Sequence, residues 1–368
     1  MMLDADLINE LQTKGARLVD PRAGVESRRG GAGPSDHKAM TLGDQTIMVP
    51  VHTAPAFQSP YVIDAPEGTA AEARVLRDGA EVGRIRFPGR PRFYDLTTAD
   101  GIPYSQIAVL HARDVLATTV LQTCIRYESR KKTCQFCAIG QSLAAGRTIA
   151  HKTPAQLAEV AKAAVELDGV RHMVLTTGTP RGPDRGAAVL ADSARAIKAA
   201  VDLPIQAQCE PPEDDAWHQR MFDAGVDALG MHLEAVTPDV RARIMPGKAS
   251  VPLEKYFSSF AASVAVFGRG QVSTYILAGL GDTADAILSM SERLVAMGVY
   301  PFVVPFVPIS GTPLESHPAP TSDFMASILA PLSRMVIAGG MKSSDIKAGC
   351  GKCGACSALS TYEKRVLA

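Results

Sequence analysis

Three cysteines lie close together in the segment CIRYESRKKTCQFC. They are Cys124, Cys134 and Cys137, and an apolar run typical of a buried strand comes directly before them. Thiolates at this spacing can converge on one centre, which suits both iron–sulfur clusters and zinc. We interpret the three as ligands of a [4Fe–4S] cluster that leaves one iron free of protein.

A structural zinc site is the alternative for these cysteines, and zinc would need a fourth ligand. His111, His151 or Cys209 could serve. The position at a strand end, with Phe136 just before the last cysteine, favours the cluster. Cys209 taken alone is more often a small buried apolar residue than a ligand.

A second group of cysteines lies near the end of the chain, in CGKCGAC. Clustered cysteines in a reducing compartment are better explained by metal than by disulfides. We therefore predict an auxiliary [4Fe–4S] cluster held by Cys350, Cys353 and Cys356. Its fourth ligand would be Ser357, Ser360 or no residue at all, and a small zinc knuckle is the alternative.

The overall charge excludes some classes of partner. The 368 residues carry 38 basic and 38 acidic side chains, so the formal net charge is zero and no global field favours nucleic acid or an anionic membrane. No apolar stretch approaches the roughly 20 residues that cross a bilayer. The N-terminal sequence MMLDADLINELQ is acidic and amphipathic, unlike a secretion signal. We expect a cytoplasmic protein.

Strands are predicted to alternate with helices from residue 115 onward. The helix predicted at Pro154–Leu167 opens with a capping box at Thr153 and Gln156. Repeated βα units imply a parallel sheet, so we predict an α/β fold with a partial (β/α)6 TIM-like barrel over residues 115–320. The six apolar runs predicted as strands are Val115–Gln122, His172–Thr176, Ile205–Gln208, Ala228–Leu233, Val272–Ala278 and Phe302–Val307.

The regions on either side of this barrel differ in pattern. Residues 1–114 contain a short helical pattern and several short strand-like runs, with a hairpin turn signal at Asp78-Gly79, so we predict an α+β cap. Residues 321–368 start with a helical pattern over Ser322–Ile337 and end in the cysteine-rich tail.

Polar residues and glycines gather where the predicted strands end. Thr176-Thr177-Gly178-Thr179 ends the second strand, Gln208-Cys209-Glu210 the third and His232-Leu233-Glu234 the fourth. In parallel βα folds the loops at the carboxyl ends of the strands form the functional pocket. The sequence therefore predicts a pocket at that rim of the barrel.

The region from about 116 to 315 resembles the radical S-adenosylmethionine (SAM) superfamily. The resemblance is carried by the cysteine loop with Phe136, by the turn GLGDT at 279–283 and by FVPISGTPLE at 306–315. More narrowly, VLTTGTPRGPDRGAA (174–188) and HLEAVTPDVRARIMPG (232–247) resemble lipoyl synthase and its biotin synthase relatives. The whole chain also resembles a bacterial radical SAM family found near nitrilase-like genes.

The resemblance implies roles for individual residues. Phe136 would pack against the adenine of SAM, and Thr177, Gly178 and Thr179 would hold the methionine amino group. Further SAM-binding positions would be Glu234 and Arg243, for the ribose and carboxylate, with Gly279 and Val307 in the turns after strands five and six.

The same resemblance implies a reaction. One electron from a ferredoxin or flavodoxin would enter the cluster, SAM would be cleaved, and a 5′-deoxyadenosyl radical would take hydrogen from a small-molecule or carrier-bound substrate. Sulfur insertion from the auxiliary cluster is the first hypothesis. Rearrangement, cyclisation or dehydrogenation, with a tail cluster that binds substrate or relays electrons, is the second. A zinc-binding barrel scaffold is the third.

The chain also departs from the superfamily pattern. The usual cluster motif has three residues between the first two cysteines, and here there are nine. Loop closure entropy grows only slowly with length, so the longer loop still permits the thiolates to converge. The acidic residue usual after the second strand is replaced by Thr179 and Pro180.

Overall fold

The barrel sheet is the centre of the molecule in the computed structural model, which describes residues 4–19, 36–65 and 72–368. Its strands follow one another in chain order from β7 to β13, and β8 to β13 are all parallel. The predicted partial (β/α)6 barrel is thus confirmed. The parallel strands are β8 (Val115–Thr119), β9 (His172–Thr176), β10 (Ile205–Gln208), β11 (Ala228–Gly230), β12 (Val272–Ala278) and β13 (Val299–Pro305).

One strand of this sheet was not expected from the sequence. The short strand β7 (Val109–His111) pairs antiparallel with β8, and the turn between them places Ala112 at a positive φ of 54°. A three-residue strand is too short to show an alternating pattern. The barrel sheet therefore begins before residue 115.

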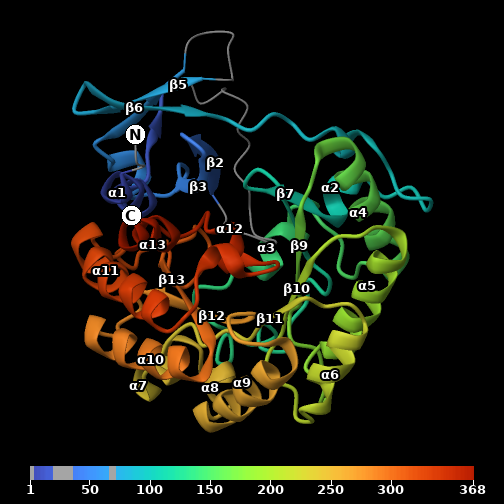
Figure 1. Ribbon diagram of the computed structural model, residues 1–368. Coiled ribbons are helices and arrows are strands. Elements are labelled where there is room, and N and C mark those ends of the chain that lie inside the picture. The colour runs from blue at the N-terminus through green and yellow to red at the C-terminus, as the bar shows by residue number, and fades with distance from the viewer. Residues whose placement is uncertain (1–3, 20–35, 66–71) are drawn as a thin grey trace.

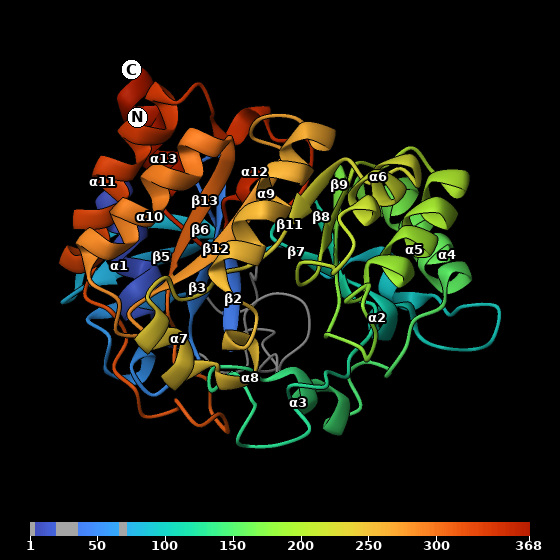
Figure 2. The same ribbon diagram turned by 90° about the horizontal axis from the view of Figure 1, so that it is seen from below.

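Helices cover the outer face of this sheet, as Figure 2 shows. The predicted capping box of α4 is present, with the Thr153 side chain accepting from the Gln156 N–H and the Gln156 side chain accepting from the Thr153 N–H. The helices that follow the strands are α4 (Pro154–Asp168), α5 (Ala187–Ala200), α6 (Ala216–Asp223), α7 (Pro238–Ile244), α8 (Pro246–Ala249), α9 (Leu253–Phe267), α10 (Ala284–Met297) and α11 (Ser322–Ala338).

The N-terminal cap contains a second, mixed sheet beside α1 (Ala5–Lys14). Its strands, in spatial order, are β1 (Arg17–Leu18), β4 (Tyr61–Asp64), β5 (Ala73–Arg77), β6 (Ala80–Arg86), β2 (His37–Leu42) and β3 (Gln45–Pro50). The predicted hairpin joins β5 to β6, with positive φ at both Asp78 and Gly79. Short helical turns lead on to the barrel: η1 (Ala56–Gln58), η2 (Arg92–Asp95), α2 (Tyr104–Ile107) and, after β8, α3 (Ile139–Ala144).

The C-terminal tail returns to the barrel and lies between it and the cap (Figure 1). It consists of η3 (Ser343–Asp345), α12 (Cys350–Cys353) and α13 (Leu359–Leu367). The Met48 N–H of the cap donates to the Ala355 carbonyl at 2.8 Å, and Ser357 Oγ donates to the Val303 carbonyl of β13 at 2.6 Å. The tail thus joins the two sheets. Across the described ranges, no helix has the length and apolar character needed to cross a membrane.

Candidate active site

The loop that carries the first three cysteines starts just after β8 and is fixed to the other side of the barrel. The Gln135 N–H donates to the Ile244 carbonyl at 2.8 Å, and the Gly247 N–H donates to the Lys132 carbonyl at 3.1 Å. Both contacts join the loop to the α7–α8 region. These bonds bring Cys134 and Cys137 to the carboxyl-end rim, although nine residues separate Cys134 from Cys124.

The three sulfur atoms lie within electrostatic range of one another. Burial and the charge of Glu234 raise the pKa of Cys134 well above its usual range, and the neighbouring Cys137 and Cys124 raise it further. Burial raises the pKa of Cys137 to about 12. All three cysteines are free of disulfides. The raised pKa keeps Cys134 and Cys137 protonated near neutral pH unless a metal centre binds them as thiolates.

The spacing of the three thiols bears on the kind of metal centre that they could hold. In the part of the chain that the structure describes, no three His, Cys, Asp or Glu side chains converge closely enough to hold one metal ion. A cluster of several irons takes its thiolate ligands on different irons, so they are spaced more widely. Cys134 and Phe136 pack against the apolar group formed by Val240, Ile244, Met245, Leu280, Phe306 and Leu314.

The residues after β9 contact the cysteine loop directly. The Gly178 N–H donates to the Leu121 carbonyl at 2.9 Å, and the Ile125 N–H donates to the Thr179 carbonyl at 2.9 Å. A Cβ on Gly178 would lie 2.2 Å from the Thr123 carbonyl oxygen, so no larger residue fits there. The Thr177 hydroxyl donates to the Gly178 carbonyl. The predicted SAM-binding segment therefore lies against the residue that precedes Cys124.

A cavity of about 320 Å³ opens inside the barrel from this rim. Phe136, Glu234 and Val307, all predicted SAM contacts, lie in its wall. Gly279 does not; it makes a turn with φ of 111°, and its carbonyl bonds His317 at 2.8 Å. Arg243 also lies outside the wall and is exposed, with its guanidinium donating to the Leu280 carbonyl at 3.3 Å.

A buried ion pair at the rim involves a residue that sequence reasoning missed. Lys248 Nζ donates to Glu234 Oε2 at 2.7 Å, and both side chains are largely buried. Burial by itself would lower the pKa of Lys248, but the charge of Glu234 raises it above its usual range. Lys248 also acts electrostatically on Cys134. The local sequence MPGKAS does not indicate this contact, because the ion pair forms only when the fold brings Lys248 next to Glu234.

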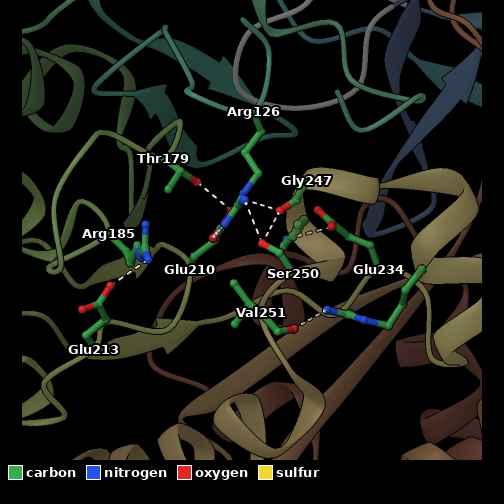
Figure 3. Close-up of polar contacts among 11 residues, drawn as sticks. Arg126, Thr179, Arg185, Glu210, Glu213, Glu234, Gly247, Ser250 and Val251 are labelled. Carbon is green, nitrogen blue, oxygen red and sulfur yellow. Dashed lines mark hydrogen bonds and ion pairs between the residues drawn. The ribbon is translucent and has the colours of Figure 1, made fainter. Parts of the chain in front are cut away.

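A second buried pair joins the cysteine loop to β10, and it too was missed (Figure 3). Arg126 donates through Nε and through an Nη to the two carboxylate oxygens of Glu210, each at 2.8 Å. It also donates to the Gly247 carbonyl, and the Thr179 hydroxyl donates to Glu210 at 2.8 Å. Burial would raise the pKa of Glu210, but Arg126 and Lys248 lower it more. This network fixes the loop, the β9 turn and α8 together.

Replacing Glu210 with glutamine should destabilise the fold and loosen the cysteine loop. The change leaves Arg126 buried with half its partner lost, and breaking such a pair costs about 3 kcal/mol. Thermal unfolding measures the effect. Because the pKa of Glu210 is lowered in the fold, its stabilisation is complete above the unfolded pKa near 4.5 and is lost as the pH falls through the folded value.

The matched control is Glu213→Gln, which breaks the pair of Arg185 with a carboxylate 61% exposed. An exposed pair contributes about 0–1 kcal/mol, so this variant should unfold near the parent temperature. Equal loss of stability in both variants would contradict a special role for the Arg126–Glu210 pair.

The neighbouring arginine, Arg241, has a structural role. It is 2% exposed, donates to the Leu233 carbonyl at 2.9 Å, and lies over the Tyr256 ring at 5.2 Å from its centroid. Arg241 therefore braces the turn after β11 that carries Glu234.

The three tail cysteines line the same barrel cavity, at its other end. Cys353 packs against Val115, Ala117 and Val174, near the start of β8 and in β9. Gln208 Nε2 donates to Cys350 Sγ at 3.3 Å. Burial raises the pKa of Cys350 to about 11, and this hydrogen bond opposes the rise. The donor set is again one of free thiols that a cluster would bind as thiolates.

The residues considered as additional ligands for the two groups of cysteines make other contacts. His111, considered as a zinc ligand for the first cysteines, has its Nε2 3.8 Å from Cys356 Sγ in the tail. Ser357 donates to the Val303 carbonyl, and Ser360 accepts from Gln45 at 3.3 Å. Cys209 is buried, at 8% exposure, with the apolar core.

The fold and the site define a βα barrel with three free cysteines in the loop after its first parallel strand. Residues 130–294 match the model of the Radical SAM superfamily, and the chain contains a radical SAM domain. The match includes Cys134 and Cys137 and begins after Cys124. A domain of this kind implies a [4Fe–4S] cluster and SAM.

The proteins with sequences similar to this chain are named for different reactions. The chain is 28% identical over 214 residues to bacteriochlorophyllide c C-7(1)-hydroxylase of Chlorobaculum limnaeum. This alignment covers 53% of each of the two proteins. It is 29% identical over 172 residues to lipoyl synthase of Marinobacter nauticus (strain ATCC 700491 / DSM 11845 / VT8), covering 46% of this chain and 47% of the relative. The chain thus spans about half the length of the curated relatives it matches.

Among solved structures, methylornithine synthase gives a TM-score of 0.49 at 16% identity, over 67% of this chain and 69% of that protein.

Proposed function

We propose that this protein is a radical SAM enzyme that functionalises a C–H bond of a substrate held inside the barrel. The observation that carries the proposal is the single cavity that runs from the SAM-side residues Phe136 and Glu234 to the tail cysteines. When bound, a [4Fe–4S] cluster with one open iron supplies the electron that cleaves SAM to a 5′-deoxyadenosyl radical. The chain's residues hold, orient and shield the reactants.

The cluster would be held by Cys124, Cys134 and Cys137, whose thiol groups act electrostatically on one another. Phe136 would pack on the adenine from the cavity wall. Glu234, oriented by Lys248, would accept hydrogen bonds from the ribose hydroxyls. The backbone and hydroxyl groups of residues 177–179 would bind the methionine amino group, and Arg243, exposed at the rim, would bind the carboxylate. Gly279 and Val307 would shape the turns beside SAM.

We also propose that Cys350, Cys353 and Cys356 hold an auxiliary [4Fe–4S] cluster. Their shared position in the cavity wall and the donor Gln208 support this, because a hydrogen bond to sulfur favours the thiolate. The tail cysteines share a cavity with the SAM side, which favours contact with substrate over remote electron relay. Sulfur insertion is therefore the first proposed outcome. Rearrangement, cyclisation or dehydrogenation with a substrate-binding cluster is the second.

The proposed electron donor is a ferredoxin or flavodoxin, and the substrate is a small molecule or a carrier-bound group. We propose a cytoplasmic location, since both clusters need a reducing compartment.

Iron and sulfide counting on protein purified without oxygen tests the proposal. Two clusters predict about eight irons and eight sulfides per chain, and a single cluster predicts about four. Zinc without iron would contradict the proposal and would favour the scaffold alternative. A count near four would leave the radical SAM function standing and remove the auxiliary cluster.

A further inference from the structure

The middle of the barrel cavity, between the SAM side and the tail cysteines, is chemically distinctive. Its wall is largely apolar, with Val174, Leu277 and Phe302 among the contributors. No lysine or arginine among the described residues lines the cavity, and Glu234 is the carboxylate in its wall. The two arginines after β9 are turned elsewhere: Arg185 pairs with Glu213, and Arg181 is exposed beside Glu128.

His232 supplies a hydrogen-bond donor to this cavity. Its Nδ1 accepts the Tyr275 N–H at 3.2 Å, so the neutral ring carries its proton on Nε2. The ring lines the cavity beside Tyr275, at 5.3 Å between ring centroids. Burial and the charge of Lys248 lower the pKa of His232 to about 3, which keeps the ring uncharged at neutral pH.

Gln208 supplies an acceptor, and backbone geometry fixes its orientation. The Cys350 N–H donates to Gln206 Oε1 at 3.1 Å, which identifies that atom as the oxygen. Gln208 Nε2 then donates to the same oxygen at 2.7 Å and to Cys350 Sγ at 3.3 Å. With both N–H groups used, Gln208 Oε1 is the atom that can accept from a ligand.

The donor and the acceptor lie side by side. Gln208 in β10 pairs in register with Gly230 in β11, and His232 follows two residues later. A Cβ on Gly230 would lie 3.0 Å from Gln208 Cγ and 3.0 Å from His232 Cε1. The two side chains therefore close over Gly230 from either side, and glycine permits that close approach.

We infer that the His232–Gln208 pair binds a compact, uncharged polar group of the substrate, with His232 donating to its acceptor and Gln208 accepting from its donor. This inference rests on the proposed function. An anionic group would find no lysine or arginine among the described residues of the cavity wall, and the nearby Lys248 is already paired with Glu234. Burial of an uncompensated charge is costly. A neutral group that both donates and accepts, such as an amide, matches the pair.

Paired probes of equal size test the inference. Benzamide and benzoate differ in charge, and both are smaller than the cavity. We expect benzamide to bind the reconstituted, SAM-loaded protein at least about tenfold more tightly than benzoate at pH 7.5, measured by calorimetry. His232→Phe should remove that preference, while His151→Phe, at an exposed position, should keep it. Gly230→Ala should weaken benzamide binding, because the added Cβ would push the Gln208 and His232 side chains out of position.

The outcomes separate this inference from the proposed function. Benzoate binding as tightly as benzamide, or no binding of either probe, would overturn the inference. A preference that persists in folded His232→Phe would also overturn it, with circular dichroism as the check on folding. Iron content and 5′-deoxyadenosine formation, measured on the same samples, report on the proposed function without reference to the probes.

Discussion

Cys134→Ala is expected to lower 5′-deoxyadenosine formation from SAM and dithionite by about a thousandfold or more. Cys134 interacts electrostatically with Glu234, Lys248 and the other two cysteines. Its loss would remove one of the three protein ligands of the proposed cluster. Losing one member of a unit that acts together removes most of its effect. Liquid chromatography of the nucleoside product measures the change, and iron content should fall by about four per chain.

The matched control is Cys209→Ala. Cys209 is a buried cysteine of the same barrel that packs in the apolar core. This variant should lose some stability through its small cavity and keep its iron and its SAM cleavage. Undiminished 5′-deoxyadenosine formation by Cys134→Ala would remove Cys134 from the ligand set.

Cys353→Ala is expected to separate SAM cleavage from productive chemistry. Cys353 lies against β8 and β9 at the tail end of the cavity, away from the rim. The variant should lose about four irons and still form 5′-deoxyadenosine within about threefold of the parent rate. Transfer of sulfur should stop, because the proposed donor cluster is gone.

The predicted loss of sulfur transfer can be measured with isotopically labelled sulfide. The tail cluster is reconstituted with ³⁴S-sulfide, the protein is incubated with SAM, reductant and a small-molecule extract, and label is sought in the products by mass spectrometry. Lys352→Ala, on the exposed face of α12, is the control that should behave as the parent does. If the parent transfers no label yet consumes a compound that Cys353→Ala leaves untouched, the tail cluster binds substrate instead. Identical behaviour of parent and variant would show that the tail is not catalytic.

The parallel strands of the barrel could be predicted because their signal is local. His172–Thr176, Ile205–Gln208 and Val272–Ala278 have the bounds that the apolar runs indicate. The last strand is shifted, from the predicted Phe302–Val307 to Val299–Pro305, since proline at 301 and 305 hides its start and end in the sequence. β7 was missed because its three residues form a strand only by pairing with β8.

The candidate site was predicted in part. Phe136, Glu234 and Val307 do line one cavity, and Gly178 and Thr179 do contact the segment that carries the first cysteines. Arg126, Glu210 and Lys248 were not recognised, since each looks like an ordinary loop or surface charge until its partner is known. Their roles come from pairs that join distant parts of the chain, Arg126 with Glu210 and Lys248 with Glu234.

The sequence by itself determined the βα order, the two groups of cysteines and the polar strand ends, because spacing and apolar periodicity are properties of neighbouring residues. Only the tertiary structure decided that the tail cysteines share a cavity with Phe136 and Glu234. These two residues precede the tail by more than a hundred positions in the sequence. It also decided that His232 and Gln208 flank Gly230. Such contacts depend on how strands pair and helices pack, and that arrangement is fixed by burial over the whole chain.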